Sequence, residues 1–376
     1  MFCRTTRLVG SLCVILAGCT SSTAIELQRT RNVALIPTLG GAVYAVQAGS
    51  DTQIVAAATW ERISEFGVQS SHAGSTFVTS FESYSDRSLR RIALPSGTEV
   101  QRVTLAGVES STADFGQVSL GFGSPFAVDD GLQTLAFALS SANRTPGVAL
   151  VDAASNRVKA FAAPFAANAV AFGQWRGLSV LFVGGSRSTT LPSRATVYML
   201  SRTSGDVVDS VDVSSPSFQP GGGLSQIIAI PALQSFVAYA SGGVTSCAGL
   251  PAGTTCRSAR IPSSSGSMWY RDGDTNIVVN DVGSSEDEGT GAIYTVALDA
   301  SSVATHVLPT VAGRPCVTRG VAAFADGTGW IVTAGSAPGY AQYPAQAARV
   351  FIVSSVTGNI VASLALPALP LRPLAF

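Results

Sequence analysis

Residues 197–213 read VYMLSRTSGDVVDSVDV, which is an alternating apolar run, a polar turn containing Gly205, and a second alternating run. Alternation with a period of two is typical of a strand with one buried face, and a short turn with glycine between two such runs indicates a β-hairpin. Three other segments share this pattern and carry Gly or Asn in the turn: RRIALPSGTEVQRVTL (90–105), VALVDAASNRVKAF (148–161) and VFIVSSVTGNIVASLAL (350–366). The chain therefore contains repeated hairpins.

A second element recurs along the chain, a polar turn that leads into a short apolar run. Six copies begin near Ser70, Asp129, Trp175, Pro231, Asp272 and Ala325, about 40 to about 58 residues apart. A unit of four short strands at this spacing matches one blade of a β-propeller. No stretch after residue 30 shows sustained helical periodicity. We therefore predict an all-β fold.

The two ends of the chain indicate the number of blades. Six complete units run from about residue 63 to residue 366, three strand-like runs precede them, and one run, LRPLAF, follows them. Three strands and one strand make a seventh unit. We predict a seven-bladed β-propeller of four-stranded antiparallel blades, closed by pairing of the N- and C-terminal strands, with residues 371–376 against residues 32–36. Closure would leave no exposed sheet edge at the junction.

These motifs resemble the YVTN-type propeller repeat, which is named for Tyr-Val-Thr-Asn on the strand after the first turn. The corresponding strands here read FVTS (77–80), IVVN (277–280) and IVTA (331–334). The family hairpin often has an aliphatic strand, an Asp, a Thr-Gly turn and a second aliphatic strand, and residues 197–213 are close to that. The resemblance implies a propeller domain over residues 31–376, with each copy degenerate.

The first residues, MFCRTTRLVGSLCVILAGC, have the pattern of an export signal. Arg4 and Arg7 precede an apolar core that is too short to span a bilayer as a permanent helix. Residues 16–19, Leu-Ala-Gly-Cys, resemble the bacterial lipobox. The resemblance implies that residues 1–18 are a signal peptide and that Cys19 carries the lipid. The alternative is an ordinary secretory signal with an incidental cysteine.

Residues 19–30 follow as a short polar tether, which we expect to be lipidated and to hold the domain close to the membrane. We therefore predict an exported protein, anchored to the cell envelope by the lipid on Cys19. Thr20 follows the lipidated position. In enteric bacteria an Asp there favours retention in the inner membrane, so Thr20 is compatible with the outer membrane.

Composition argues against several functions. Only 12% of the residues are charged, the net charge is zero and Lys159 is the only lysine. A nucleic-acid partner needs a basic face, and a nucleotide bound by a Walker A loop needs Gly-Lys-Ser/Thr, so we expect neither. The content of apolar residues, 46%, is enough for a sizeable core.

Few residues suggest a catalytic or metal-binding role. Asp272, Asp274 and Asn276 have the spacing of a calcium loop, yet the glycine and glutamate of that loop are missing, which favours a plain turn. His72 and His306 are the only histidines, and neither position suggests the central tunnel. We predict no catalytic residue, no metal site and no cofactor. A propeller hydrolase of the lactonase type stays open, because tunnel carboxylates would come from distant blades.

Five connections between the second and third strands of a unit are enlarged, and in a propeller such connections emerge on one face. Arg and Tyr are enriched at interface hot spots, and loops on a rigid scaffold often carry function. The candidate binding rim consists of Arg144, Arg187, Arg194, Glu286, Asp287, Glu288, Tyr340 and Tyr343.

These residues suggest a non-catalytic binding or scaffolding propeller that recruits a protein or glycan partner. The alternatives are neutral drift of surface loops, the lactonase, and an accessory lipoprotein of an outer-membrane assembly or secretion complex.

The stretch TSCAGLPAGTTCRS places Cys247 and Cys256 nine positions apart. Export implies an oxidising compartment, so a disulfide is favoured over a zinc knuckle, which would need four ligands. The bridge should contribute about 2–3 kcal/mol to stability. We expect it to brace the longest loop of the binding rim, and we expect Cys316 to be a buried free thiol.

Overall fold

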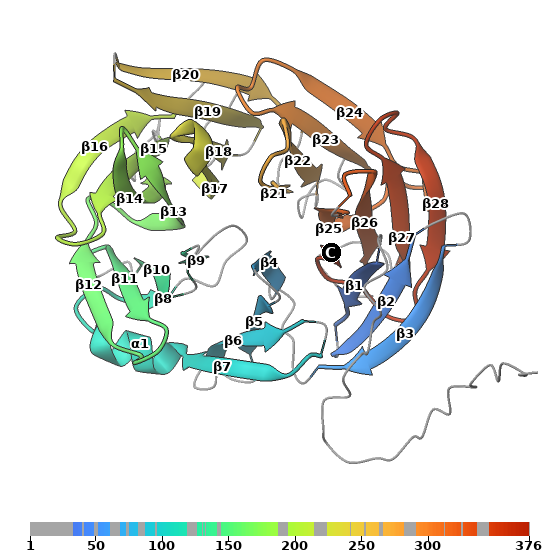
Figure 1. Cartoon of the computed structure of the whole chain (residues 1–376), viewed down its shortest axis with the longest axis horizontal. Helices are drawn as coiled ribbons and strands as arrows, with labels where there is room; N and C mark the ends of the chain where they lie inside the picture. The colour runs from blue at the N-terminus through green and yellow to red at the C-terminus, as the bar shows by residue number, and fades with distance from the viewer. Residues whose placement is uncertain are drawn as a thin grey trace, which may run out of the picture.

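The computed structural model describes residues 33–375, except residues 40, 49–51, 61–67, 73–74, 82–86, 95, 119–125, 130, 132, 141–143, 187–194, 214–223, 241, 252, 263–265, 282–290, 312, 325 and 337–345. The chain forms seven antiparallel sheets, arranged as blades around a central axis (Figure 1). The predicted all-β, seven-bladed propeller is confirmed.

The first three blades along the chain span β4 to β16. Blade 1 contains β4 (Val68–His72), β5 (Ser75–Phe81), β6 (Arg87–Ala93) and β7 (Glu99–Thr104). Blade 2 contains β8 (Gln117–Val118), β9 (Phe126–Val128), β10 (Thr134–Ser140), β11 (Gly147–Asp152) and β12 (Val158–Ala162). Blade 3 contains β13 (Ala167–Trp175), β14 (Leu178–Ser186), β15 (Ala195–Ser201) and β16 (Val207–Asp212).

The remaining blades span β17 to β29 and the first three strands. Blade 4 contains β17 (Leu224–Ile230), β18 (Ser235–Ala240), β19 (Gly243–Leu250) and β20 (Gly253–Arg260). Blade 5 contains β21 (Gly266–Trp269), β22 (Asn276–Asp281), β23 (Ala292–Ala297) and β24 (Val303–Val307). Blade 6 contains β25 (Thr318–Ala323), β26 (Gly329–Ser336), β27 (Gln346–Ser354) and β28 (Ile360–Ala365). Blade 7 contains β29 (Leu374–Ala375), β1 (Val33–Pro37), β2 (Ala42–Gln47) and β3 (Gln53–Thr59).

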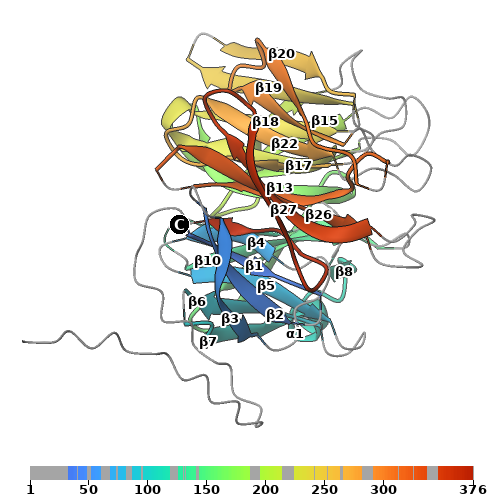
Figure 2. The ribbon, with the colours of Figure 1, turned by 90° about the vertical axis from the view of Figure 1, so that its right-hand side faces the viewer.

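The first strand of each blade lies nearest the axis and the fourth lies at the rim (Figure 1). Because the strands are antiparallel, the connections from first to second and from third to fourth strands lie on one side, which we call the turn face. The connections from second to third strands and from blade to blade lie on the other side, the loop face. Figure 2 views the disc edge-on, with the turn face and the C-terminus at the left.

Blade 7 combines both ends of the chain. β29 pairs with β1 in the register Ala34–Ala375 and Leu35–Leu374, and Thr38 forms an isolated bridge with Pro370. The predicted closing pair is confirmed, although its ladder is shorter than expected. Asn32 and Phe376 lie outside the described residues.

Arg372 strengthens this closure by reaching across the inner strands of two other blades. Its backbone passes over Gly320 of β25, and its Nη2 donates to the carbonyl of Met268 on β21 at 3.3 Å. The same carbonyl accepts from Nε2 of Gln226 on β17 at 2.9 Å, and the Met268 N–H donates to Oε1 of Gln226 at 2.6 Å. Burial lowers the pKa of Arg372 to about 10, so it stays charged at neutral pH. The inner strands of blades 4 to 7 are thus tied together.

The predicted turns at Gly97, Asn156, Gly205 and Gly358 are confirmed, and each has a left-handed backbone. Gly205 (φ 81°) and Gly358 (φ 69°) also need to lack a side chain. A Cβ at Gly205 would collide with the ring of Phe161 in blade 2, and one at Gly358 would collide with His306 in blade 5. The outer turn of one blade therefore packs directly on the blade before it.

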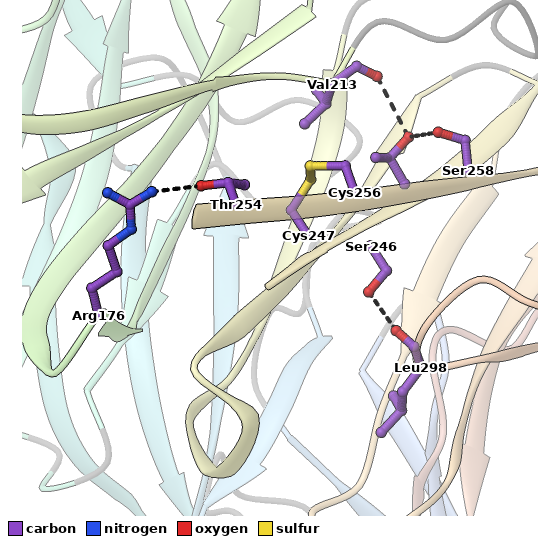
Figure 3. The surroundings of a disulfide bond; sticks show 9 residues. Arg176, Val213, Ser246, Cys247, Thr254, Cys256, Ser258 and Leu298 are labelled. Carbon is purple, nitrogen blue, oxygen red and sulfur yellow. Dashed lines mark hydrogen bonds between the residues drawn. A yellow bond between two sulfur atoms is a disulfide. The ribbon is translucent and has the colours of Figure 1, made fainter. Parts of the chain in front are cut away.

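The disulfide between Cys247 and Cys256 is confirmed, but its expected position in a loop is wrong. Only residues 241–242 separate β18 from β19, and the two cysteines are directly paired on β19 and β20. Cys247 is buried in the core between blades 3 and 4 (Figure 3). The sequence of this segment resembles a loop because it is rich in Ser, Thr and Gly. Strands at the rim can have this composition, because only one of their faces packs on the core. The bridge therefore braces an outer hairpin whose tip lies on the turn face.

Blade 2 departs from the predicted pattern in two ways. A short helix, α1 (Leu105–Ser111), connects it to blade 1, although no helix is predicted. It forms because Leu105 and Val108, three positions apart, are buried together in the core between the blades. In addition, two short strands, β8 and β9, both pair with β10 at the inner position, so the sheet has five strands.

Replacing Gly320 with alanine tests the closure. A Cβ at this position would lie 2.7 Å from the Cα of Arg372, so the C-terminal segment would have to move. We expect Gly320→Ala to lower the free energy of unfolding by about 1–3 kcal/mol, measured by denaturant titration. Gly131→Ala is the matched control, because its Cβ would meet only Cγ of Gln133 at 3.5 Å. Equal stability of the two variants would contradict the closure role.

Candidate functional site

The loop face between blades 1 and 2 holds a candidate site. The connection between these blades contains α1, and the connection between β10 and β11 contains Arg144. The two connections meet, because the Arg144 guanidinium donates to the carbonyl of Ala113. Arg144 is thus the one predicted rim residue that the described part of the chain places, and it lies on the expected face.

The segment after α1 is held by short-range hydrogen bonds and by one aromatic contact. Oγ1 of Thr112 donates to the carbonyl of Val108 at 3.0 Å, and the N–H of Phe115 donates to the carbonyl of Thr112 at 2.9 Å. The Phe115 ring then packs on Gly147 at the start of β11, where a Cβ would lie 2.6 Å from Cδ1. These contacts fix the connection to blade 2.

A largely buried ion pair fixes the same connection to blade 1. Nη2 of Arg87 on β6 lies 2.5 Å from Oε1 of Glu109, with side-chain exposures of 7% and 17%. The same carboxylate oxygen accepts the N–H of Val118 on β8 at 2.9 Å. Glu109 therefore joins the third strand of blade 1 to the inner strand of blade 2. Hydrogen bonds to a charged acceptor are stronger than neutral ones, so this carboxylate orients the whole segment.

A polar cavity of about 420 Å³ opens beside this pair. Its lining consists of Glu109, Ser110, Gly116, Gln117 and Arg144. Gln117 and Arg144 are exposed, so their amide and guanidinium can offer several donors and one acceptor to a ligand. Gly116 has φ 102°, a conformation that side chains disfavour, and the chain turns there from the helical segment into β8. The cavity suits a polar group on a larger partner.

The other seven predicted rim residues lie outside the described residues, as does Cys19. The strands that flank residues 187–194, 282–290 and 337–345 are in each case the second and third strands of a blade. Their ends lie on the loop face, as expected. The fifth connection that the sequence predicts to be enlarged contains Cys247 and Cys256, and it forms the strands β19 and β20 instead.

Sequence reasoning missed Glu109 and Gln117. Glu109 lies in the segment between two units, where the strand pattern carries no information. The available signal was the spacing of Leu105 and Val108, which indicates one helical turn with a buried side. Nothing in the sequence separates Glu109 from the other acidic residues, because its partner Arg87 is 22 positions away.

The side chains that the sequence analysis weighed as calcium ligands or catalytic residues lie in ordinary structural positions. Asp274 accepts from Arg271, with Nη2 to Oδ1 at 2.5 Å, within the turn before β22. His306 lies on the outer strand β24, where Nε2 is 3.0 Å from Oγ1 of Thr295, and burial lowers the pKa of its imidazole. His72 is the last residue of β4.

Cys316 is a buried free thiol, as predicted. Its Sγ donates to the carbonyl of Pro309 at 2.8 Å, and burial raises its pKa to about 11. Within the ranges that the structure describes, no three His, Cys, Asp or Glu side chains gather as metal ligands would. Among the placed residues no helix is long and apolar enough to cross a bilayer.

Comparison with known proteins supports the fold. No family model and no curated protein matches the sequence. A proposed 6-phosphogluconolactonase from Bacteroides uniformis is similar in structure, with a TM-score of 0.56 and 12% identity over 92% of this chain and 99% of that one. The Dos1 propeller has a TM-score of 0.52 and 8% identity over 93% and 88%. A functionally unknown protein from Desulfotomaculum acetoxidans has a TM-score of 0.51 and 11% identity over 88% and 95%. At these identities the likeness shows a β-propeller and nothing finer.

The role of Glu109 can be tested by Glu109→Gln, which keeps the size of the side chain and removes the charge beside Arg87. Breaking a buried ion pair typically costs about 3–5 kcal/mol, and we expect a loss of about 3 kcal/mol in the free energy of unfolding. Arg257→Gln is the control, because the Arg257–Asp299 pair is exposed, at 62% and 64%, and we expect no measurable change. An equal loss in both variants would contradict the anchoring role.

Proposed function

We propose that the chain is an exported cell-envelope lipoprotein and that its propeller is a non-catalytic binding or scaffolding module. The loop face would recruit a protein or glycan partner. The observation that carries this proposal is the polar cavity beside Glu109, because it opens next to Arg144 on the face where the enlarged connections emerge.

The cavity is suited to binding because it is built before any partner arrives. The buried Arg87–Glu109 pair and the packing of Phe115 on Gly147 already hold the lining in place. Binding to a preorganised surface loses less conformational entropy than binding that must order a loop. The exposed Arg144 side chain beside it is of the type most often found at hot spots.

The YVTN-type repeat and the lipid anchor are part of the same proposal. The hairpin turns with left-handed Gly or Asn agree with the repeat pattern. The anchor rests on the lipobox-like residues 16–19, and Thr20 after Cys19 is compatible with the outer membrane. The propeller begins at β1, on the turn face, so an anchor at the N-terminus would leave the loop face accessible.

The lactonase type of hydrolase is the second candidate, since one structural neighbour is a proposed 6-phosphogluconolactonase. That likeness supports the shared fold at 12% identity. The third possibility, an accessory role in an outer-membrane assembly or secretion complex, would be a special case of the binding role. Binding is the role that the cavity favours.

Lipidation is tested by Cys19→Ser in the full-length chain, expressed in a bacterium that processes lipoproteins. We expect the parent protein in the membrane fraction, carrying a metabolically incorporated labelled fatty acid, and the variant without label in the soluble or periplasmic fraction. Cys13→Ser is the matched control, because Cys13 lies in the apolar core of the predicted signal and should not be acylated. Labelled Cys19→Ser protein would refute the anchor.

Partner binding is tested by Arg144→Glu in a crosslinking pull-down from the native envelope. We expect recovery of the specific partner to fall at least about tenfold, the usual effect of reversing a hot-spot residue. Arg157→Glu is the control, because Arg157 is an exposed arginine of the same blade whose turn lies on the other face. Equal recovery with both variants would refute the role of the loop face, and turnover of 6-phosphogluconolactone by the purified protein would favour the hydrolase.

A further inference from the structure

The turn face carries exposed leucines on neighbouring blades. Leu178 is 55% exposed at the start of β14, Leu233 is 53% exposed in the 3₁₀ turn η1 (Pro231–Leu233), and Leu250 is 47% exposed at the end of β19. Val356, in the turn between β27 and β28, is 89% exposed. Large apolar side chains on surface turns lose contact with water only when another phase or molecule covers them.

The turns that carry the three leucines are bonded to one another. The Gly177 N–H donates to Oε1 of Gln234 at 2.8 Å, and the Gly249 N–H donates to the Gln234 carbonyl at 3.1 Å. Nη2 of Arg176 reaches Oγ1 of Thr254 at 2.9 Å, across from blade 3 to blade 4 (Figure 3). The disulfide closes the hairpin that ends in Leu250. The leucines are therefore held as rigid projections.

Four arginines around these turns have an aspartate partner, in the pairs Arg176–Asp209 at 3.4 Å, Arg202–Asp129 at 2.9 Å, Arg257–Asp299 at 3.2 Å and Arg271–Asp274 at 2.5 Å. An uncompensated basic surface would indicate attraction to anionic lipid or to nucleic acid. This face instead offers apolar groups among paired charges, so its contact with a partner would depend little on salt or on anionic headgroups.

The chain also enters the propeller on this face. β1 is the second strand of its blade and starts at Val33, so its first residue lies on the turn face, where the C-terminus also lies (Figure 2). Residues 19–32 connect Val33 to the predicted lipid and can span at most about 50 Å when fully extended. The anchor therefore starts on the side of the molecule that exposes the leucines.

We infer that the turn face rests on the lipid bilayer, with Leu178, Leu233 and Leu250 inserted at the level of the headgroups and upper acyl chains. This inference rests on the proposed lipidation of Cys19. The bilayer is the occupant that fits best, because the leucines project from separate turns and a fluid hydrocarbon layer can surround each of them. The loop face then points away from the membrane, toward its partner.

The experiment uses the full-length lipidated protein in phosphatidylcholine vesicles that contain a lipid-borne quencher. Leu178→Cys and Leu233→Cys receive an environment-sensitive fluorophore, while Cys316 is buried and Cys247 and Cys256 are bonded to each other. Leu39→Cys is the matched control, because Leu39 is a 39% exposed leucine in the connection from β1 to β2, on the loop face. Val356→Cys gives an independent position if one variant fails to fold.

We expect a blue-shifted emission and loss of most of the fluorescence at residues 178 and 233, unchanged in high salt, and neither effect at residue 39. Vesicle-bound protein with equal, unquenched emission at residues 39 and 178 would overturn the inference and leave the anchor intact. A blue shift at residue 178 without quenching would also overturn it and indicate a protein partner or a second copy. Protein that does not float with the vesicles at all would refute both the anchor and the inference.

Discussion

Hydrogen bonding between β29 and β1 joins the last strand of the chain to the first, and the whole ring depends on that contact. The ladder itself is short, with Ala34 opposite Ala375 and Leu35 opposite Leu374. Burial supports it, because Leu371 and Leu374 pack with the inner strands of blade 7. Without this strand, β1 would expose an unpaired edge to the centre of the ring, which is a site for wrong pairing.

Contacts from the C-terminal segment also connect the closing strand to blades 6, 5 and 4. Oγ1 of Thr333 in blade 6 donates to the Leu371 carbonyl at 2.9 Å, and Arg372 reaches Met268 in blade 5. Met268 is in turn bonded through its backbone to Gln226 in blade 4. At the rim, the outer turns hold neighbouring blades by packing on aromatic and histidine rings. The result is a rigid disc whose two faces can differ without affecting the core.

The two faces have different chemistry. The loop face has the polar cavity, the Arg87–Glu109 pair below it, and Arg144 beside it. The turn face has exposed leucines among paired charges, and both ends of the propeller chain. A propeller allows this division because successive connections alternate between the faces. A lipid contact on one side and a partner contact on the other would therefore not compete.

The repeated hairpins were predictable because each depends on local features, namely a period of two in apolarity and one Gly or Asn that accepts a left-handed backbone. The closing strand was predictable for a related reason: the strand count left three runs at one end and one at the other. The hairpin of Cys247 and Cys256 was misplaced because its Ser-, Thr- and Gly-rich strands carry little apolar signal. α1 was missed because a helix of seven residues, about two turns, is too short for its period to stand out.

The sequence by itself determined the number of blades, the turns and the disulfide pairing, since each depends on neighbouring residues or on a simple count. Only the tertiary structure decided which residues share a site. Glu109 meets Arg87 across 22 positions, and Arg372 meets Met268 across 104, because blades far apart along the chain become neighbours when the ring closes. It also decided which face each connection occupies, and so separated the cavity of the loop face from the leucines of the turn face.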